Sequence, residues 1–428
     1  MNRKSAASGR HHSVLILGVG AFAQSTAQIL KDDGADVSTY LTRNYGHYPP
    51  SLAGRTFAAA RFASPVPILK ESKTTLVIPM SIDWAQSPWA PELLKTRVPI
   101  FGPTGEAMRI ERERDFARKL CREFKIPFPR AYVAENRLAA ERILKRQPRP
   151  FVIKNPLCSP TSPVHTILCE AVEDTRSWLR NVNYAEGIFL QEYLGRAEAG
   201  HIALVSGGEV YPLVTNQEYK RAFAGNMGVV AGAPLGGLVE RDPEDKYGLA
   251  KELLFPLKKW FRSVDYHGPI QVTALKHKGR WHTVEYNIRI GVTSGAMLLR
   301  MLSDPLEVLM ATAGNRALDL KFRDGVDFGC SVTLAGYGYP YVQQRGPALP
   351  IEVTGRFDRQ CDVWWNEVSA DDDGRLLSTG HRICDVIGFG RNLQDALAVA
   401  YRNIRRIRSL ASYYRPDVGQ TLWPPGNE

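Results

Sequence analysis

Residues 13–41, SVLILGVGAFAQSTAQILKDDGADVSTYL, decide the fold class of this chain. An apolar strand is expected over 13–17, a helix over 24–31 and a second strand over 35–41. Two strands joined through a helix lie parallel, so the pattern predicts an α/β sheet. Gly18 and Gly20 allow a tight turn at a helix N-terminus, where phosphate can bind. The second strand ends without a ribose-binding acid, so close packing alone also explains the glycines.

The rest of the chain continues to alternate between strands and helices, with no internal repeat. Thr104 is expected to cap a charged amphipathic helix over 105–124, which the KIPFP segment at 125–129 stops. The remaining elements are read from apolar periodicity and from breakers. Strands are expected at 75–79, 98–101, 151–154, 187–191, 201–215, 269–275 and 280–289, helices at 173–182, 246–262 and 393–411, loops at 155–165 and 222–237, and a β-rich, glycine-rich stretch at 330–340.

The bulk composition is that of a globular protein with several domains. The chain has 428 residues, of which 44% are hydrophobic and 23% charged. A chain of this length is too long for a single hydrophobic core and suits about two to four domains. No apolar run is long enough to span a bilayer, and residues 1–12 are expected to be a disordered basic tail rather than a signal peptide. The six cysteines form no C-x-x-C pair, so we expect buried thiols in a reducing cytoplasm.

The net charge of +11 bears on the kind of partner. A basic chain can bind nucleic acid, but it can also attract anionic metabolites such as ATP. The densest basic cluster, Arg402–Arg408 (RNIRRIR), is interpreted as the solvated face of a helix. No nucleic-acid-binding motif accompanies it, so neither nucleic-acid nor membrane binding is expected.

Glu285, Asn287 and Arg289 are the most informative polar residues. They follow the strand-like run 280–284 and alternate along an extended segment, so they project to one face. The carboxylate and the amide oxygen are hard ligands that Mg²⁺ accepts beside substrate phosphates, and the guanidinium suits a carboxylate or a phosphate. A solvated strand face also explains this segment when it is taken alone.

Three upstream segments have the composition of a nucleotide site. Lys154 ends a strand ahead of a polar loop and can reach phosphates as a point charge. Gln191–Leu194 (QEYL) follows an apolar strand and can offer polar groups to an adenine edge. Gln217–Arg221 (QEYKR) places acidic and basic groups on a turn-like segment. A surface lysine, an ordinary strand exit and a solvated loop are the corresponding structural explanations.

Taken in order, these segments resemble glycinamide ribonucleotide synthetase (phosphoribosylamine–glycine ligase), a family of the ATP-grasp superfamily. The likeness extends over roughly residues 13–420 and rests on a series of motifs. The motifs are Ile100–Thr104 (IFGPT), Glu111–Phe116 (ERERDF), Lys125–Pro127 (KIP), Phe151–Lys154 (FVIK), Gln191–Leu194, Gln217–Arg221, Gly225–Gly228 (GNMG), Glu285–Arg289 (EYNIR), Ala335–Pro340 (AGYGYP) and Thr379–Ile383 (TGHRI).

The resemblance implies an ATP-grasp fold of α/β and α+β type. It implies an N-terminal Rossmann-like domain with a parallel sheet over 13–103, a first ATP-grasp part with the lid over 104–190, a second part with the metal site over 191–325, and a C-terminal β-rich domain over 326–420. The residues implied are Arg114, Lys154, Gln191, Glu192, Leu194 and Glu198 for ATP, Glu285 and Asn287 for Mg²⁺, and Arg289 and Lys220 for catalysis.

The implied reaction is phosphoryl transfer from ATP to a carboxylate, after which an amine attacks the acyl phosphate to give an amide, ADP and phosphate. Such catalysis consists mainly of positioning and charge neutralisation. The implied partners are a small-molecule carboxylate and a small-molecule amine. The implied protein is a cytoplasmic monomer or homodimer.

The substrate-side motifs depart from the family pattern. The family's Gly-Gly-Arg-Glu-His turn reads GAFAQ at 20–24, its Gly-Lys-Gly-Val loop reads SPTSPVH at 159–165, and its Arg-Phe-Gly-Asp-Pro-Glu segment reads RIGVTS at 289–294. Prolines donate no N–H to phosphate, and the acids that would hold a glycine amine are missing. We therefore expect a carboxylate–amine ligase with altered substrates. The alternatives are a diverged true phosphoribosylamine–glycine ligase and a non-catalytic ATP-binding protein.

Overall fold

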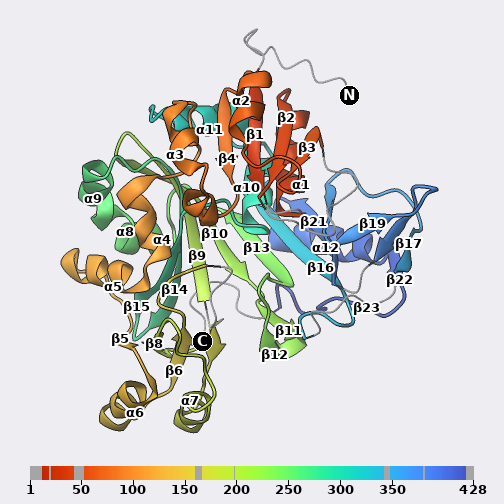
Figure 1. Ribbon diagram of the computed structural model, residues 1–428. Coiled ribbons are helices and arrows are strands. Elements are labelled where there is room, and N and C mark those ends of the chain that lie inside the picture. The colour runs from red at the N-terminus through yellow and green to blue at the C-terminus, as the bar shows by residue number, and fades with distance from the viewer. Residues whose placement is uncertain are drawn as a thin grey trace.

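The computed structural model describes residues 12–18, 21–42, 53–159, 166–196, 198–341, 348–378 and 381–420, with residues 21 and 22 as backbone only. The expectations for the tail at 1–11, the turn at 19–20, the loop at 160–165 and residues 379–380 lie outside the described residues. Figure 1 shows an N-terminal α/β unit at the top, a small lid at the lower left and a β-rich region at the right.

The N-terminal unit contains the predicted parallel sheet. All residues of its strand β1 are buried, which explains the continuous apolar run. Helix α1 (Ala21–Asp32) packs on the sheet, with α2 (Val66–Glu71) and α3 (Ala90–Lys95) nearby. The strand predicted over 98–101 is wrong, because only Ile100 forms a bridge, to Val77, and Pro99 offers no N–H to a ladder. The strand order is β3 (Arg55–Ala58), β2 (Asp36–Leu41), β1 (Ser13–Gly18), β4 (Leu76–Pro79).

The helix predicted over 105–124 is wrong as a single element. The chain forms a 3-10 turn η2 (Gly105–Met108), then α4 (Arg109–Arg112) and α5 (Arg114–Glu123), with Glu113 extended between the two helices. Glu113 leaves the helix because its backbone forms a bridge with Leu157, just beyond the strand that ends at Lys154. Thr104 occupies the N-cap position, but its side chain makes no capping hydrogen bond.

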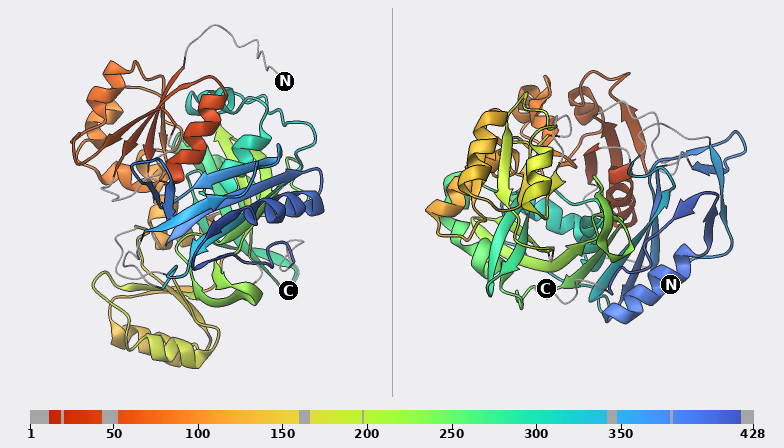
Figure 2. Two further views of the ribbon diagram at one scale, coloured as in Figure 1. Left: turned by 90° about the vertical axis from the view of Figure 1, so that its right-hand side faces the viewer. Right: turned by 90° about the horizontal axis from the view of Figure 1, so that it is seen from below.

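The lid is an antiparallel sheet with two helices on one face, α6 (Arg137–Arg146) and α7 (Val172–Trp178) (Figure 2). Apolar side chains from strands and helices form its core. Asn136 caps α6 by accepting a hydrogen bond from the backbone of Ala139. Helix α7 ends at Trp178 rather than at the predicted Val182. The strand order is β5 (Ala131–Ala134), β8 (Ile188–Glu192), β6 (Phe151–Lys154), β7 (Ile167–Leu168).

A large antiparallel sheet runs through the second half of the molecule. Its strand β13 (Gly236–Arg241) pairs with β16 (Phe328–Gly336), so the sheet is continuous across the boundary expected between 325 and 326. The four-part division of the chain stays a prediction. The strand order is β15 (Arg280–Asn287), β14 (Gly268–His277), β9 (Glu198–Ser206), β10 (Glu209–Glu218), β13 (Gly236–Arg241), β16 (Phe328–Gly336), β21 (Arg382–Gly390), β18 (Cys361–Trp365), with β23 (Ser412–Tyr413) beside β16.

Three helices pack against this sheet, and one of them also contacts the N-terminal unit. Helix α10 (Ser294–Met301) contacts α1 of the N-terminal unit and strand β13, and α11 (Pro305–Ala313) contacts β9. Helix α12 (Leu393–Ile404) packs across β16 and β21. These contacts hold the N-terminal unit above one end of the sheet and leave the other end facing the lid (Figure 1).

Three other predicted elements are corrected by tertiary pairing or by proline. The loop at 222–237 contains a hairpin of β11 (Arg221–Phe223) and β12 (Met227–Val230). The helix at 246–262 divides at Pro256 into α8 (Leu249–Leu253), η4 (Phe255–Leu257) and α9 (Lys258–Ser263).

The last predicted helix ends at Ile404, because residues 407–409 form β22 (Ile407–Ser409) against β17 (Leu349–Val353). The same small sheet includes β19 (Val368–Ala370) and β20 (Leu376–Ser378). The basic cluster at 402–408 is therefore divided between a helix and a strand. Two of its members, Arg402 and Arg406, form ion pairs with Asp358.

All six cysteines are free thiols. Four are buried as predicted, whereas Cys158 and Cys361 are partly exposed. None of the helices in the described ranges combines the length and the apolar composition that a bilayer crossing needs.

Candidate active site

A cavity of about 570 Å³ lies between the lid, the end of the large sheet that faces it, and the β11–β12 hairpin. The lid contributes Val152, Lys154 and Leu168, and the large sheet contributes Leu275, Val284 and Glu285. Residues 191–196 cross from one to the other and line the same space. The cavity thus combines apolar walls with a few charged groups, which is typical of small-molecule sites.

Seven of the ten predicted site residues line this cavity. Lys154, Gln191, Glu192, Leu194, Glu198, Lys220 and Glu285 come from distant parts of the chain and are brought together here. Arg114 stands just behind the wall, where its Nη1 lies 3.2 Å from the Glu285 carboxylate. Asn287 and Arg289 do not line the cavity. The strand predicted over 280–289 ends at Asn287, so Asn287 lies on the predicted strand face and Arg289 follows in a bend just beyond it. Burial alternates along 285–290, with 286, 288 and 290 buried and 285, 287 and 289 partly exposed.

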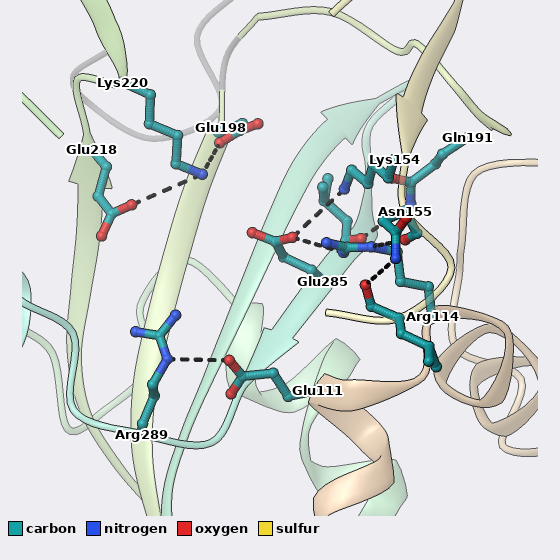
Figure 3. A network of polar contacts seen from close by, with 12 residues as sticks. Glu111, Arg114, Lys154, Asn155, Gln191, Glu198, Glu218, Lys220, Glu285 and Arg289 are labelled. Atoms are coloured by element: carbon teal, nitrogen blue, oxygen red, sulfur yellow. Dashed lines mark hydrogen bonds and ion pairs between the residues drawn. The ribbon is translucent and has the colours of Figure 1, made fainter. Parts of the chain in front are cut away.

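Glu285 is the centre of one ionic cluster (Figure 3). Its carboxylate is 3.2 Å from Arg114 Nη1 and 3.6 Å from Lys154 Nζ. Burial opposes the charge of Glu285, but Lys154, Lys220 and Arg114 outweigh it and hold the pKa of Glu285 well below its usual range. Glu285 therefore stays ionised at neutral pH.

Lys154 ends β6 and is buried, with 3% of its surface exposed. Burial lowers the pKa of Lys154 to about 8, Glu285 opposes this shift, and Arg114 adds to it. Arg114 also donates through Nε to the backbone oxygen of Asn155, at 2.9 Å. The break in the predicted helix therefore sets Arg114 against both the chain that leaves Lys154 and the carboxylate of Glu285.

Lys220 is the centre of a second cluster on the opposite wall (Figure 3). Its Nζ is 2.9 Å from the Glu198 carboxylate and 3.9 Å from that of Glu218. Burial opposes the charge of Lys220, but Glu198, Glu218 and Glu285 raise its pKa above the ordinary value. Burial raises the pKa of Glu218, and Lys220 acts in the opposite direction. The two clusters face each other across the cavity, each with acid and base side by side.

The segment 191–194 carries the chain from the lid to the large sheet. Gln191 is buried and donates to the backbone oxygen of Val284 at 3.1 Å, so it ties β8 to β15. Glu192 pairs with Arg149 on the lid. With Val152, Leu168 and Leu275 around it, this crossing forms an apolar slot with polar edges.

Several lining residues were missed by sequence reasoning. Glu218 belonged to a quoted motif but not to the predicted site, and its place at the end of β10, two residues before Lys220, was the available signal. Tyr339 and His381 also belonged to quoted motifs but not to the predicted site, whereas Arg196 had no site signal. Arg196 is joined by an ion pair to Glu170, which also pairs with Arg221 at 2.7 Å.

Glu111 was likewise missed, because an acid within a highly charged helical segment does not stand out. Its side chain is buried, accepts a hydrogen bond from the backbone N–H of Ile288 at 2.6 Å, and lies 3.2 Å from Arg289 Nε. Arg289 is therefore held beside the cavity rather than in its wall. Asn287 lies between Glu285 and Arg289 in the sequence and pairs in register with Gln271 of β14.

A buried group of potential metal ligands lies outside the cavity. His201, Asp242 and Asp245 offer ligand atoms within 4.8 Å of one another. The carboxylates are already engaged, Asp242 with Thr215 and a backbone N–H, and Asp245 with two backbone N–H groups at the start of α8. Burial lowers the pKa of His201 to about 3. The group therefore anchors the loop before α8.

Comparisons with known proteins give this cavity a family context. The ATP-grasp (A) domain of phosphoribosylglycinamide synthetase matches residues 112–291, and the C domain of the same enzyme matches residues 329–421. These two segments together make up well over half of the chain. The first contains every predicted site residue, and the second contains Tyr339 and His381.

Three of the similar curated proteins are phosphoribosylamine–glycine ligases. Phosphoribosylamine–glycine ligase from Streptomyces coelicolor is 27% identical over 330 residues, which cover 75% of this chain and 78% of that enzyme. The enzyme from Caldanaerobacter subterraneus subsp. tengcongensis is 25% identical over 341 residues, covering 76% and 80%. The chloroplastic enzyme from Arabidopsis thaliana is 25% identical over 348 residues, covering 77% of this chain and 64% of its own length.

Solved structures confirm the predicted fold class. The phosphoribosylamine–glycine ligase of Thermotoga maritima superposes with a TM-score of 0.74 at 21% identity, over 95% of this chain and 99% of that chain. The biotin carboxylase of Campylobacter jejuni gives a TM-score of 0.70 at 12% identity, over 95% and 93%. The chain is therefore an ATP-grasp ligase, and over residues 112–291 and 329–421 it belongs to the phosphoribosylglycinamide synthetase family.

Proposed function

We propose that this chain activates a carboxylate with ATP and joins it to an amine, with substrates other than phosphoribosylamine and glycine. The observation that carries the reaction is the cavity, in which Lys154, Lys220 and Glu285 face one another beside the slot formed by residues 191–194. Each predicted nucleotide residue except Arg114 lines this space, and Arg114 touches it through Glu285.

In this proposal the adenine lies in the slot at 191–194 and the ribose lies near Glu198. Lys154 and Arg114 hold the phosphates, since both are cations at the base of the lid. Lys220 neutralises charge on the transferred phosphoryl group from the opposite wall. Arg289 binds the substrate carboxylate, because a guanidinium can hold it through two parallel hydrogen bonds.

The residues present fit a Mg²⁺ ion. Glu285 is ionised and lines the cavity, and Asn287 projects from the same face of the same strand, so both offer hard oxygen ligands beside phosphate oxygens. When bound, Mg²⁺ supplies charge neutralisation to the phosphates. The chain's own contribution is to hold the donors, orient the carboxylate and surround the reacting groups with fixed charges.

The reaction balances as two displacements. A carboxylate oxygen attacks the γ-phosphorus of ATP, the bond to the β-phosphate oxygen breaks, and ADP leaves. The amine nitrogen then attacks the acyl carbon, the bond to the phosphate oxygen breaks, and the nitrogen loses a proton to give the amide. Positioning and electrostatics supply most of such catalysis, which suits a site made of paired charges.

The proposal of altered substrates is supported by the residues at the substrate-side positions. Val292 and Ser294 stand where the family pattern has acids; Val292 is apolar and partly exposed, and Ser294 is fully buried, with 0% of its surface exposed. Ser294 accepts a hydrogen bond from Asn216 in the interior. Gln24, at the end of the uncharged N-terminal turn, is also buried. These positions present no carboxylate to an amine.

The test is a panel of acids and amines, with ADP and phosphate release measured separately from ATP binding. We expect acid- and amine-dependent release of ADP with at least one pair other than glycine and phosphoribosylamine. Strong rescue of a purine auxotroph would instead identify a true phosphoribosylamine–glycine ligase. Tight ATP binding with no ADP release across the panel would identify a non-catalytic binder.

A further inference from the structure

Glu111 contacts Arg289 and the backbone of the preceding residue, although it lies outside the cavity (Figure 3). It sits on α4 with only 4% of its surface exposed. One carboxylate oxygen accepts from the backbone N–H of Ile288 at 2.6 Å, and the other lies 3.2 Å from Arg289 Nε. The same group therefore fixes the backbone just before Arg289 and the Nε atom of its guanidinium.

This arrangement leaves the outer edge of the guanidinium open. Among the described residues, no hydrogen bond or ion pair to Nη1 or Nη2 of Arg289 is present, and 31% of its side chain is exposed. Glu111 raises the pKa of Arg289, so the group stays cationic beside Glu218 and Glu285. A guanidinium held by Nε alone still offers two parallel N–H donors to a carboxylate.

Burying a carboxylate such as that of Glu111 costs free energy unless the carboxylate is paired. Satisfying one backbone N–H takes only one of its oxygens. The second oxygen restricts the rotation of the long Arg289 side chain, so less conformational entropy is lost when that side chain binds a ligand. An arginine fixed in advance binds its ligand more tightly than a free one.

We propose that Glu111 is a positioning residue that aims the Nη edge of Arg289 at the substrate carboxylate. This inference rests on the proposed role of Arg289. Glu111 itself touches neither substrate nor ATP. It acts through Arg289 across a sequence separation of 178 residues.

The experiment measures binding of acetate, the simplest carboxylate probe, to the full chain through the Nε–H signal of Arg289 in ¹⁵N NMR spectra. Three variants are compared with the wild type, namely Glu111→Gln, Arg289→Gln and the double variant. We expect Glu111→Gln to raise the acetate Kd about tenfold, as expected for loss of one charge-assisted hydrogen bond. For the Arg289→Gln variants, which lack the signal, acetate Kd is measured by calorimetry. The double variant should match Arg289→Gln, since Glu111 acts only through Arg289.

Asp362→Asn is the matched control. Asp362 accepts from Arg300 Nε at 2.8 Å, so the substitution weakens a similar ion pair away from the cavity, and acetate and ATP binding should not change. ATP affinity should also stay unchanged in Glu111→Gln, a result that a general loss of structure does not produce. If Glu111→Gln fails to fold, Glu111→Asp keeps the charge, but its shorter side chain cannot span both contacts and should also raise the acetate Kd.

The outcomes separate the two proposals. No effect of acetate on the Arg289 signal in the wild type removes Arg289 from the carboxylate site and overturns both. Acetate binding that depends on Arg289 but is unchanged in Glu111→Gln and Glu111→Asp overturns the positioning role alone. Equal losses of acetate and ATP binding in the Glu111 variants also overturn it, because they identify a purely structural residue.

Discussion

Replacing Glu285 by glutamine removes a proposed Mg²⁺ ligand and the counter-charge of Lys154 in one step. The shape of the side chain is retained, so the change is electrostatic. In the wild type the carboxylate lies 3.6 Å from Lys154 Nζ, with Lys154 almost fully buried. At an effective dielectric constant of about 20, Coulomb's law gives a gross attraction of about 5 kcal/mol at this separation.

The net consequence is read from the pKa of Lys154. That pKa is about 8 in the presence of Glu285, because burial lowers it and Glu285 opposes the shift. An opposite charge at this range favours the charged form of its partner, so the loss of Glu285 lowers the pKa of Lys154 further. A smaller fraction of Lys154 is then charged at neutral pH, and the phosphates lose positive charge as well as the metal ligand. Together these losses should lower kcat by at least about 100-fold.

The assay is acid-dependent ADP release at saturating ATP, with ATP affinity measured by calorimetry with and without Mg²⁺. We expect Glu285→Gln to lower turnover by at least about 100-fold, to weaken ATP binding even without Mg²⁺, and to fold normally. The control is Glu209→Gln, which removes a carboxylate from a half-exposed pair with Lys258 and should leave turnover unchanged. Wild-type turnover and wild-type ATP affinity in Glu285→Gln would refute the reasoning.

Three further outcomes are expected. ATP affinity should fall as pH rises through about 8, because Lys154 is a cation only below its pKa. The variant Lys154→Arg should remove this fall, since arginine stays charged. The same pH profile in Lys154→Arg as in the wild type would contradict the role of Lys154. Arg289→Lys should lower ADP release with every accepted acid while ATP affinity holds, and equal rates with several acids would take Arg289 out of the site. Asp385→Asn should lower the free energy of unfolding in urea by about 3–5 kcal/mol, because buried Arg382 then loses the carboxylate that lies 2.7 Å away. The control Arg375→Ala, at an exposed ion pair, should cost less than about 1 kcal/mol.

The parts of the fold that follow local patterns were predicted from the sequence. Strand β1 is a continuous apolar run because it is buried on both faces, and the alternation along 285–290 appears as alternating burial. Proline divides one of the elements that were wrong, at Pro256, and several others give way to pairing with distant segments of the chain. Glu113 leaves its helix for Leu157, and residues 407–409 leave theirs for β17. Helix propensity is a weak preference that such contacts override.

The site was predicted in its parts but not in its geometry. Motif composition pointed to Lys154, Lys220 and Glu285, and all three line the cavity. It did not show that Glu218 forms an ion pair with Lys220, or that Arg289 lies outside the cavity wall and pairs with Glu111. Those relations depend on how the lid, the large sheet and the helix before the lid pack together.

The sequence by itself determined the type of most elements, the family and the polar run from Glu285 to Arg289, because periodicity and residue chemistry are local properties. Only the tertiary structure decided which charges meet. Arg114 reaches Glu285 across 171 residues and Glu111 reaches Arg289 across 178, and nothing local distinguishes these acids and bases from the many others in a charged helix. They meet because a buried charge is stable only beside a partner, and the packing of separate elements chooses that partner.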